Sequence, residues 1–293
     1  MRRRSSIAAV ALLAAGGLGV YGCQRLERGG RVTPIGVDEA VERYRDEAAA
    51  TDATAATTAP ATTAPAMTAP ATAAPAAPAT TAPATTTPAA TPTLPTPGVY
   101  VYVTSGFDAV DVLTGARHDY PAATTLTVTA SGCGVRLRWD VAVERWDTRD
   151  WCLDGAGVRE TAMVSYHEFF GVGGRHDYVC TGDARPLDAD PGTTWSWTCV
   201  MGDTDTTAFE GVVVERTTLD VAGEPVAVSH VRVTAEVTGE SSGQHDIEGW
   251  YRTTDGLPVL EVGSISTVQP TPLGDTNFTE EYSIALSSSV PIG

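Results

Sequence analysis

The stretch from Ala48 to Pro97 consists almost entirely of alanine, threonine and proline, and it contains ten prolines. Each proline removes a backbone N–H donor and disfavours the helical region for the residue before it. Because Met67 and Leu94 are its only large apolar side chains, the stretch cannot bury enough surface to offset the entropy of ordering. We expect a disordered tether over 48–97, spanning roughly 150 Å if fully extended. The tether is either a plain spacer or a carrier of O-linked sugars on its threonines.

The N-terminus has the layout of an export signal, with arginines at positions 2–4 followed by an apolar run from Ile7 to Tyr21. Three interpretations of residues 1–23 remain. The run is an uncleaved membrane helix, a cleaved signal peptide, or a lipoprotein signal ending at Cys23, since Val20-Tyr-Gly-Cys23 resembles a bacterial lipobox. In the first and third cases the domain after the tether lies outside the cytoplasm, attached to the cell membrane.

Residues 24–47 form a juxtamembrane segment with one short amphipathic pattern. Val37, Ala40, Val41 and Tyr44 are spaced at i, i+3, i+4 and i+7, which indicates a helix of about ten residues. Isolated helices of that length are marginal in water. We therefore expect this helix to need the membrane surface or a partner in order to form.

The acidic character of the chain lies in residues 98–293. Of 293 residues, 19 are basic and 36 acidic; the first 97 hold eight arginines and seven acids, so the remainder holds eleven arginines and 29 acids. A field of that sign repels phosphate backbones. Nucleic acid is therefore excluded as a partner, and the composition predicts no oligomeric state.

Four cysteines follow the tether, at positions 133, 152, 180 and 199. An even number in an exported chain predicts two disulfides, and three pairings are open. We favour Cys133 with Cys152 and Cys180 with Cys199, because each pair encloses an expected hairpin. The first would turn near 141–144 and the second near 188–192, where Asp-Pro-Gly is a turn signal. Zinc is the weaker alternative, since no C-x-x-C pair occurs.

Alternation of apolar and polar residues with period two dominates residues 98–293. It is clear in 126–130, 135–139, 195–201, 231–237 and 282–286, and turn clusters rich in glycine, threonine and aspartate separate these runs. The pattern predicts an all-β domain. We expect a single antiparallel meander of about ten strands that curls into a half-barrel or an open barrel.

One late segment carries a family resemblance. Trp250-Tyr-Arg-Thr-Thr-Asp-Gly-Leu-Pro-Val259, followed by a strand from Glu261 to Val268, resembles the late hairpin of LolA-type and mycobacterial lipid-carrier lipoproteins. The whole chain also resembles uncharacterised, tethered, exported proteins of actinobacteria. The first resemblance implies a curved sheet that binds a lipid or a lipoprotein.

Aromatic residues with strand spacing supply the candidate binding face, which comprises Trp195, Trp197, Trp250 and Phe169. A stripe of this kind is ordinarily core. The alternative is an aromatic groove for an acyl chain, a glycan or a peptide. Because Trp195 and Trp197 share strand parity with Cys199, a disulfide and two indoles should lie together.

No string in the domain predicts catalysis. Gly239-Glu-Ser241-Ser-Gly243 matches the serine-hydrolase pattern G-x-S-x-G, but the following residues predict a strand, whereas the pattern functions at a strand-to-helix turn. Imidazoles adjoin carboxylates in Ser165-Tyr-His167-Glu168 and in His176-Asp177. Adjacent strand residues point to opposite faces, so neither pair is preassembled, although a triad could form between strands.

The five histidines are therefore expected at the surface or rim, with His230 facing solvent. Asp188 with Asp190, and Asp203 with Asp205, have the chemistry of calcium ligands but not the spacing of a full calcium loop. We expect no metal, no cofactor and no catalytic residue.

These observations predict a membrane-anchored, extracytoplasmic binding or scaffold module of the cell envelope without enzymatic activity. Its ligand would be a lipid, a glycan or an envelope protein. Two alternatives remain, an envelope hydrolase that acts on glycan or ester bonds and an adhesive domain that contacts the cell wall.

Overall fold

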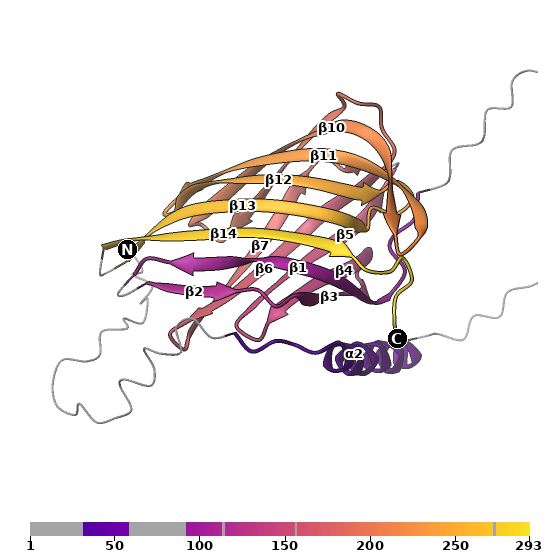
Figure 1. Ribbon diagram of the computed structural model, residues 1–293, viewed down its shortest axis with the longest axis horizontal. Coiled ribbons are helices and arrows are strands. Elements are labelled where there is room, and N and C mark those ends of the chain that lie inside the picture. Colours follow the sequence, from indigo (N-terminus) through magenta and orange to yellow (C-terminus); the bar gives the residue numbers. More distant parts are fainter. Residues whose placement is uncertain (1–31, 59–91, 113–114, 156, 272–273) are drawn as a thin grey trace, which may run out of the picture.

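A computed structural model describes residues 32–58, 92–112, 115–155, 157–271 and 274–293 (Figure 1). The expected signal or anchor, the Cys23 lipidation site and most of the expected tether lie outside the described residues. Within these ranges no helix has both the length and the apolar character needed to cross a lipid bilayer.

The described part of the chain contains fourteen strands and one helix, in an all-β architecture. The elements are α2 (Val37–Thr58), β1 (Gly98–Val110), β2 (Ala116–Asp119), β3 (Ala123–Ser131), β4 (Gly134–Ala142), β5 (Arg145–Asp154), β6 (Gly157–Phe169), β7 (Val172–Gly182), β8 (Arg185–Pro186), β9 (Thr194–Met201), β10 (Asp205–Val221), β11 (Glu224–Gly239), β12 (Ser242–Arg252), β13 (Pro258–Thr271) and β14 (Gly274–Leu286).

The sheet is a closed antiparallel barrel. Strands β3 to β14, without β8, follow one another as neighbours, and β1 pairs with both β3 and β14. The β1–β14 register runs from Tyr102 opposite Leu286 to Val110 opposite Phe278. The short strands β2 and β8 add to β1 and β6. The antiparallel all-β expectation is thus confirmed, but the half-open shape and the count of about ten strands are wrong.

Closure has a physical reason. A sheet of this size would expose two long edges of unpaired N–H and C=O groups, and pairing the first strand with the last removes both edges. The strand count was underestimated because β5, β6 and β7 carry polar residues on their inward faces. Most residues of β6 are therefore half-buried on both sides, and the alternation is weak there.

One end of the barrel, which we call the closed end, is filled by apolar side chains. Tyr100, Tyr102, Val228 and Leu257 are fully buried there. Leu187, in the connection between β8 and β9, belongs to the same cluster. The chain just before β1 also covers this end, because the N–H of Thr93 donates to the carbonyl of Thr254 at 2.9 Å and Leu94 packs against the cluster.

Helix α2 packs against the outside of the barrel, near β1 and β3 (Figure 1). Ala40 and Val41 are buried against Val99 of β1, with Val37 and Tyr44 beside them. These are the residues of the expected amphipathic stripe. The barrel wall is thus one partner that this helix contacts.

Polar contacts flank the docked helix. Arg43 forms an ion pair with the buried Asp140 of β4, and Thr33 donates from both its N–H and its hydroxyl to Glu144, each at 2.7 Å. The helix continues to Thr58, beyond the expected tether boundary at Ala48 and just before the first proline of the tract.

Both disulfides join the cysteines favoured from the sequence, Cys133 with Cys152 and Cys180 with Cys199. The first closes the β4–β5 hairpin, which turns at Val143 as expected. The second links directly opposite residues of β7 and β9. The segment between those strands contains β8 and the turn at Asp190, where the N–H of Thr193 donates to the Asp190 carbonyl at 3.1 Å.

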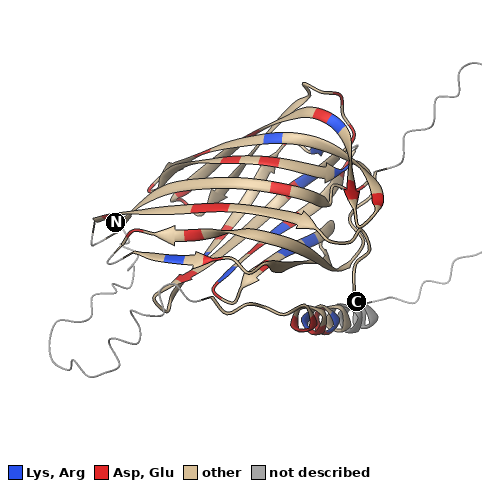
Figure 2. Cartoon of the chain, in the orientation of Figure 1, with Lys and Arg blue, Asp and Glu red and all other residues tan. Residues whose placement is uncertain are grey.

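Charged residues are spread along the strands of the barrel (Figure 2). In β10, for example, Glu210 is exposed between the buried Phe209 and Gly211. This alternation places apolar side chains toward the lumen and acids toward water. Strands β5, β6, β13 and β14 depart from this rule and carry charge inward as well.

Candidate functional site

The lumen holds a cavity of about 410 Å³. Its lining begins at the apolar cluster of the closed end, where Leu126 and Ile284 contribute. It extends to the opposite end of the barrel, where Phe169, Met201 and Gln269 stand next to the turns and are partly exposed. The volume lies within the range typical of small-molecule sites. The cavity is thus closed at one end and reaches solvent at the other.

Aromatic rings form one wall of the cavity. Trp197 of β9 stacks on Phe209 of β10 with ring centroids 4.5 Å apart and planes 4° apart. Trp195 lies parallel to Trp197 at 6.4 Å, and His245 of β12 meets Phe209 edge-on at 6.0 Å. Such a wall offers a flat surface to a planar or apolar part of a ligand.

Charged side chains form the facing part of the lining. Arg145 of β5 lies 2.6 Å from Asp147 and 2.8 Å from Glu280 of β14, and the hydroxyl of Tyr120 donates to Glu280 at 2.5 Å. Burial alone would raise the pKa of Asp147, but the Arg145 charge outweighs burial and holds that pKa below its ordinary value. The contact between Arg145 and Glu280 connects β5 with β14, two strands that are not neighbours in the sheet.

A second charged group surrounds Glu261 of β13. Its two carboxylate oxygens accept hydrogen bonds from Tyr251 at 2.5 Å and Tyr282 at 2.7 Å. Both rings lie over glycines, Gly249 and Gly263, where a Cβ would come within 2.3 Å of the ring atoms. Glycine at these two positions is what allows the tyrosines to lie flat and reach the carboxylate.

Several residues of the lining carry buried polar atoms without a partner among the residues that the structure describes, and most of these atoms are donors. The indole N–H groups of Trp195 and Trp197 have no acceptor in the described part of the chain, and the same holds for Nε and Nη1 of Arg145. The unpaired acceptor among the charged lining residues is Oδ1 of Asp147. Buried donors are costly unless they find an acceptor. The lining therefore favours a ligand that brings acceptor oxygens.

Ser165, His167 and Asp108 form a hydrogen-bonded chain at the cavity. The Oγ atom of Ser165 lies 2.9 Å from Nε2 of His167, and Nδ1 of His167 lies 3.1 Å from Oδ2 of Asp108. Ser165 and His167 line the cavity, whereas the Asp108 side chain has no exposed surface. The connectivity is that of a catalytic triad.

Asp108 is held from its other side by His118 of β2. Nδ1 of His118 lies 2.9 Å from Oδ1 of Asp108, although without the alignment of a hydrogen bond. The His118 ring stacks on Phe169 at 4.4 Å. Burial alone would raise the pKa of Asp108, but the contacts with His118 and His167 outweigh burial and lower it to about 2. Asp108 is therefore an ionised, fixed acceptor.

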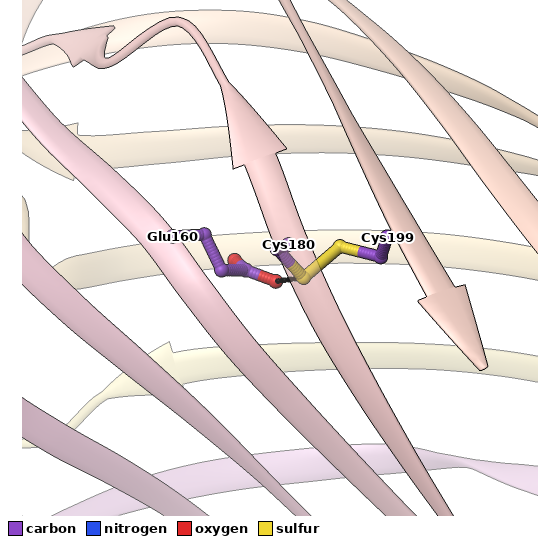
Figure 3. A group of neighbouring side chains, drawn as sticks. All are labelled: Glu160, Cys180 and Cys199. Carbon is purple, nitrogen blue, oxygen red and sulfur yellow. Dashed lines mark hydrogen bonds between the residues drawn. A yellow bond between two sulfur atoms is a disulfide. The ribbon is translucent and has the colours of Figure 1, made fainter. Parts of the chain in front are cut away.

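Glu160, Cys180 and Cys199 bring three potential metal ligands together, and they are the one such group among the described residues (Figure 3). Figure 3 shows the Glu160 carboxylate pointing toward the disulfide, with an oxygen 3.9 Å from Sγ of Cys180. Both sulfurs are bonded to each other, so they offer no thiolate to a metal. Burial raises the pKa of Glu160, against the lowering effect of the Arg149 charge.

The candidate aromatic face is only partly assembled. Trp195, Trp197 and Phe169 line the cavity, and both indoles lie close to the Cys180–Cys199 bridge as expected. Trp250 does not join them. Its ring stacks on His230 at 4.1 Å, next to Glu248 on the outward face of β11 and β12, because its strand parity is opposite to that of its neighbour Tyr251.

The histidine expectation is wrong for most of the set. His118 is 1% exposed, and His167, His176 and His245 face the cavity. His230 faces outward as expected, but its stacking on Trp250 leaves it only 12% exposed. A closed barrel has an interior large enough to take these rings, which a strand pattern alone does not reveal.

The other sequence candidates lie in turns and surface pairs. Ser241 is in the β11–β12 turn, where its N–H donates to Asp205 at 2.6 Å, and the structure shows no histidine bonded to it in the described ranges. Asp188 and Asp190 both contact Arg216, at 3.0 and 3.5 Å. Neither aspartate pair forms a cluster of metal ligands in the part of the chain that is described.

Sequence reasoning missed the charged residues of the lumen, Asp108, Arg145, Arg149, Glu261 and Glu280. One signal was present. Arg145, Asp147 and Arg149 alternate with period two, and so place three charges on one face of a strand. A polar stripe of this kind in a barrel can line the lumen. The residues that these charges contact on other strands could be identified only from the closed barrel.

Comparison of the chain with protein-family models, with curated proteins and with solved structures found no match.

Proposed function

We propose that this protein is a membrane-attached, extracytoplasmic binding module whose barrel lumen holds a small amphiphile with acceptor oxygens, such as a carboxylate or an ester carbonyl. One observation carries the proposal. A single cavity places the stacked rings of Trp197 and Phe209 beside N–H groups that have no acceptor in the described residues. Ligand sites typically combine an apolar lining with a few converging polar groups in this way.

The chemistry of the lining narrows the ligand class. A purely apolar chain would leave the N–H groups of Trp195 and Arg145 without acceptors and would lie against buried charge, at a cost of about 1–3 kcal/mol for each unpaired group. A purely charged molecule would gain little from the aromatic wall. A planar or apolar body that ends in a carboxylate or a carbonyl satisfies both parts.

The N-terminal sequence supports the extracytoplasmic, membrane-attached location. The arginine-led apolar run at the N-terminus is typical of exported chains. The two disulfides support an oxidising compartment, because structural disulfides are rare in reducing cytoplasm.

The test uses 4-nitrobenzoate, a water-soluble probe with one aromatic ring and one carboxylate. Titration of the full chain should quench tryptophan fluorescence to saturation, with one molecule bound per chain by equilibrium dialysis. Trp197→Leu should weaken binding about fivefold, since an aromatic stacking contact contributes about 1 kcal/mol. Trp250→Leu is the matched control, because this indole lies outside the cavity, and it should bind as tightly as the parent.

Equal affinity of the two variants, or quenching that never saturates, would overturn the proposal. Thermal melts of each variant establish that the barrel is intact in the comparison.

A further inference from the structure

We propose that Ser165 is a nucleophile which, with His167 as its general base, cleaves a carboxylic ester bound in the lumen. This activity rests on the proposed function in one respect, that the lumen admits a carbonyl-bearing ligand. It departs from the expectation of a non-enzymatic module. The geometry of three residues from β1 and β6 carries it.

The hydrogen bonds of His167 run in the direction that a general base requires. A carboxylate only accepts, so Nδ1 of His167 carries the proton that it shares with Asp108 at 3.1 Å. Nε2 of the neutral imidazole then presents its lone pair to the hydroxyl of Ser165, 2.9 Å away. This tautomer is the one in which histidine can remove a proton from serine.

Asp108 is more deeply buried than His167 and Ser165. The Asp108 side chain is fully buried, His167 is 18% exposed, and Ser165 is partly exposed where it lines the cavity. Ser165 and His167 are two residues apart on β6, so they share the inward face. The hydroxyl is thus available to a ligand, whereas the carboxylate is shielded from water.

Neighbouring residues hold Asp108 and His167 in place. Asp108 is contacted from its other side by His118 at 2.9 Å, and that ring stacks on Phe169. The His167 ring also packs edge-on against Phe278 at 4.8 Å. Catalytic groups work best when neighbouring residues hold them in one geometry. Asp108 acts through His167 and is a positioning residue.

The reaction is balanced by water alone. Ser165 Oγ forms a bond to the carbonyl carbon while its proton moves to Nε2 of His167. The bond from that carbon to the alcohol oxygen then breaks, and His167 returns the proton to the leaving alcohol. Water attacks the acyl-serine, again losing a proton to His167, which passes it to Ser165 as the acid departs. One ester and one water become one acid and one alcohol.

The developing oxyanion requires donors near Ser165. Arg145 lies directly opposite His167 in the β5–β6 register, and its Nε and Nη1 atoms have no acceptor among the described residues. A cationic donor aimed at the carbonyl oxygen stabilises the tetrahedral intermediate. The same N–H groups would hold the carboxylate of 4-nitrobenzoate, so binding and chemistry share this end of the lining.

The test is covalent labelling of the folded full chain with a fluorophosphonate, in which a serine–phosphorus bond forms and fluoride leaves. Label should appear in the tryptic peptide 160–175, at Ser165. Hydrolysis of 4-nitrophenyl butyrate should fall at least about 100-fold in Ser165→Ala, as for loss of a nucleophile. Ser266→Ala is the matched control, because this serine lies on the exposed face of β13 and not in the cavity lining, and it should leave both readouts unchanged.

Asp108→Asn should slow labelling while the affinity for 4-nitrobenzoate stays constant, a split that a merely structural role would not produce. Label absent from Ser165 in folded protein, or hydrolysis retained in Ser165→Ala, overturns the proposal. Binding and labelling are measured on the same sample. Saturable binding of 4-nitrobenzoate without labelling of Ser165 refutes only the catalytic step. Labelling without binding supports the nucleophile and refutes the binding module, and absence of both refutes the two proposals together.

Discussion

The hydroxyl of Tyr282 donates a 2.7 Å hydrogen bond to Oε1 of Glu261, inside the barrel. The other carboxylate oxygen accepts from Tyr251, so the two rings and one carboxylate join β12, β13 and β14. Burial raises the pKa of both tyrosines, and the Glu261 charge raises it further. The tyrosines therefore remain donors at any ordinary pH.

Glu261→Gln should destabilise the barrel by about 1–3 kcal/mol, because an amide offers one acceptor and leaves one buried hydroxyl unpaired. Urea denaturation followed by circular dichroism measures the change. Glu210→Gln is the matched control on the exposed face of β10 and should change stability by no more than about 0.5 kcal/mol. A loss for Glu261→Gln as small as that of the control would contradict this account of the Glu261 contacts.

Because His245 is partly buried, the folded barrel should lose stability as the pH falls from about 6.5 to about 4. Burial, followed by the Arg149 charge, lowers its pKa from 6.5 to about 4. In that interval the unfolded chain binds a proton that the folded chain does not, so stability falls as pH falls, by about 3 kcal/mol in all. In His245→Gln this part of the pH dependence should vanish. His230→Gln, on the outer face, should retain it, and parallel curves for parent and His245→Gln would refute the assignment.

Loss of either disulfide should cost about 3 kcal/mol, since each closes a loop of about twenty residues in the unfolded chain. Replacing Cys180 and Cys199 by serine should have the larger effect. That pair lies in the interior next to Trp195, where serine hydroxyls would lie within a largely apolar cluster, whereas Cys133 lies in the β3–β4 turn. Thermal unfolding of the two double variants checks the order, and a greater loss for the 133/152 variant would show that the turn contributes more than the lumen.

Val41→Asp should detach helix α2 without opening the barrel. Val41 is buried against Val99, and an unpaired carboxylate there would be strongly unfavourable. Hydrogen exchange of residues 37–50 should accelerate at least about tenfold, while exchange in β1 and β3 stays slow. Glu42→Gln, one position along on the exposed side, is the control. If exchange is unchanged in Val41→Asp, polar contacts such as the ion pair of Arg43 with Asp140 are enough to keep the helix on the barrel.

Much of the fold could be predicted because its signals are local. Alternation in segments such as 195–201 and 231–237 specifies strands with one apolar face. Tight turns make successive strands antiparallel neighbours, and the equal spacing of the cysteines matches two bridges across such neighbours. The stripe of Val37, Ala40 and Val41 predicted a helix with one buried face. The paired strands and the paired cysteines lie close in sequence, whereas Val99, against which the helix packs, does not.

The site could not be predicted in the same way. Ser165 and His167 were noted, but their partner Asp108 lies far earlier in the chain, and nothing in either segment specifies that β1 and β6 face each other. The same holds for Arg145 with Glu280. Trp250 was grouped with the wrong face because Ile247 and Trp250 are both apolar but lie on opposite faces of β12, and only the closed barrel shows that the face of Ile247 and Tyr251 is the inward one.

By itself, the sequence determined that residues 98–293 form an antiparallel all-β domain, which of the three cysteine pairings to favour, and where chain composition changes before the barrel. Only the tertiary structure decided that β1 pairs with β14. Closure depends on the summed twist and register of twelve strands, a property of the whole sheet and not of any segment. It created an interior in which polar side chains from distant strands meet, and hence the Ser165–His167–Asp108 chain.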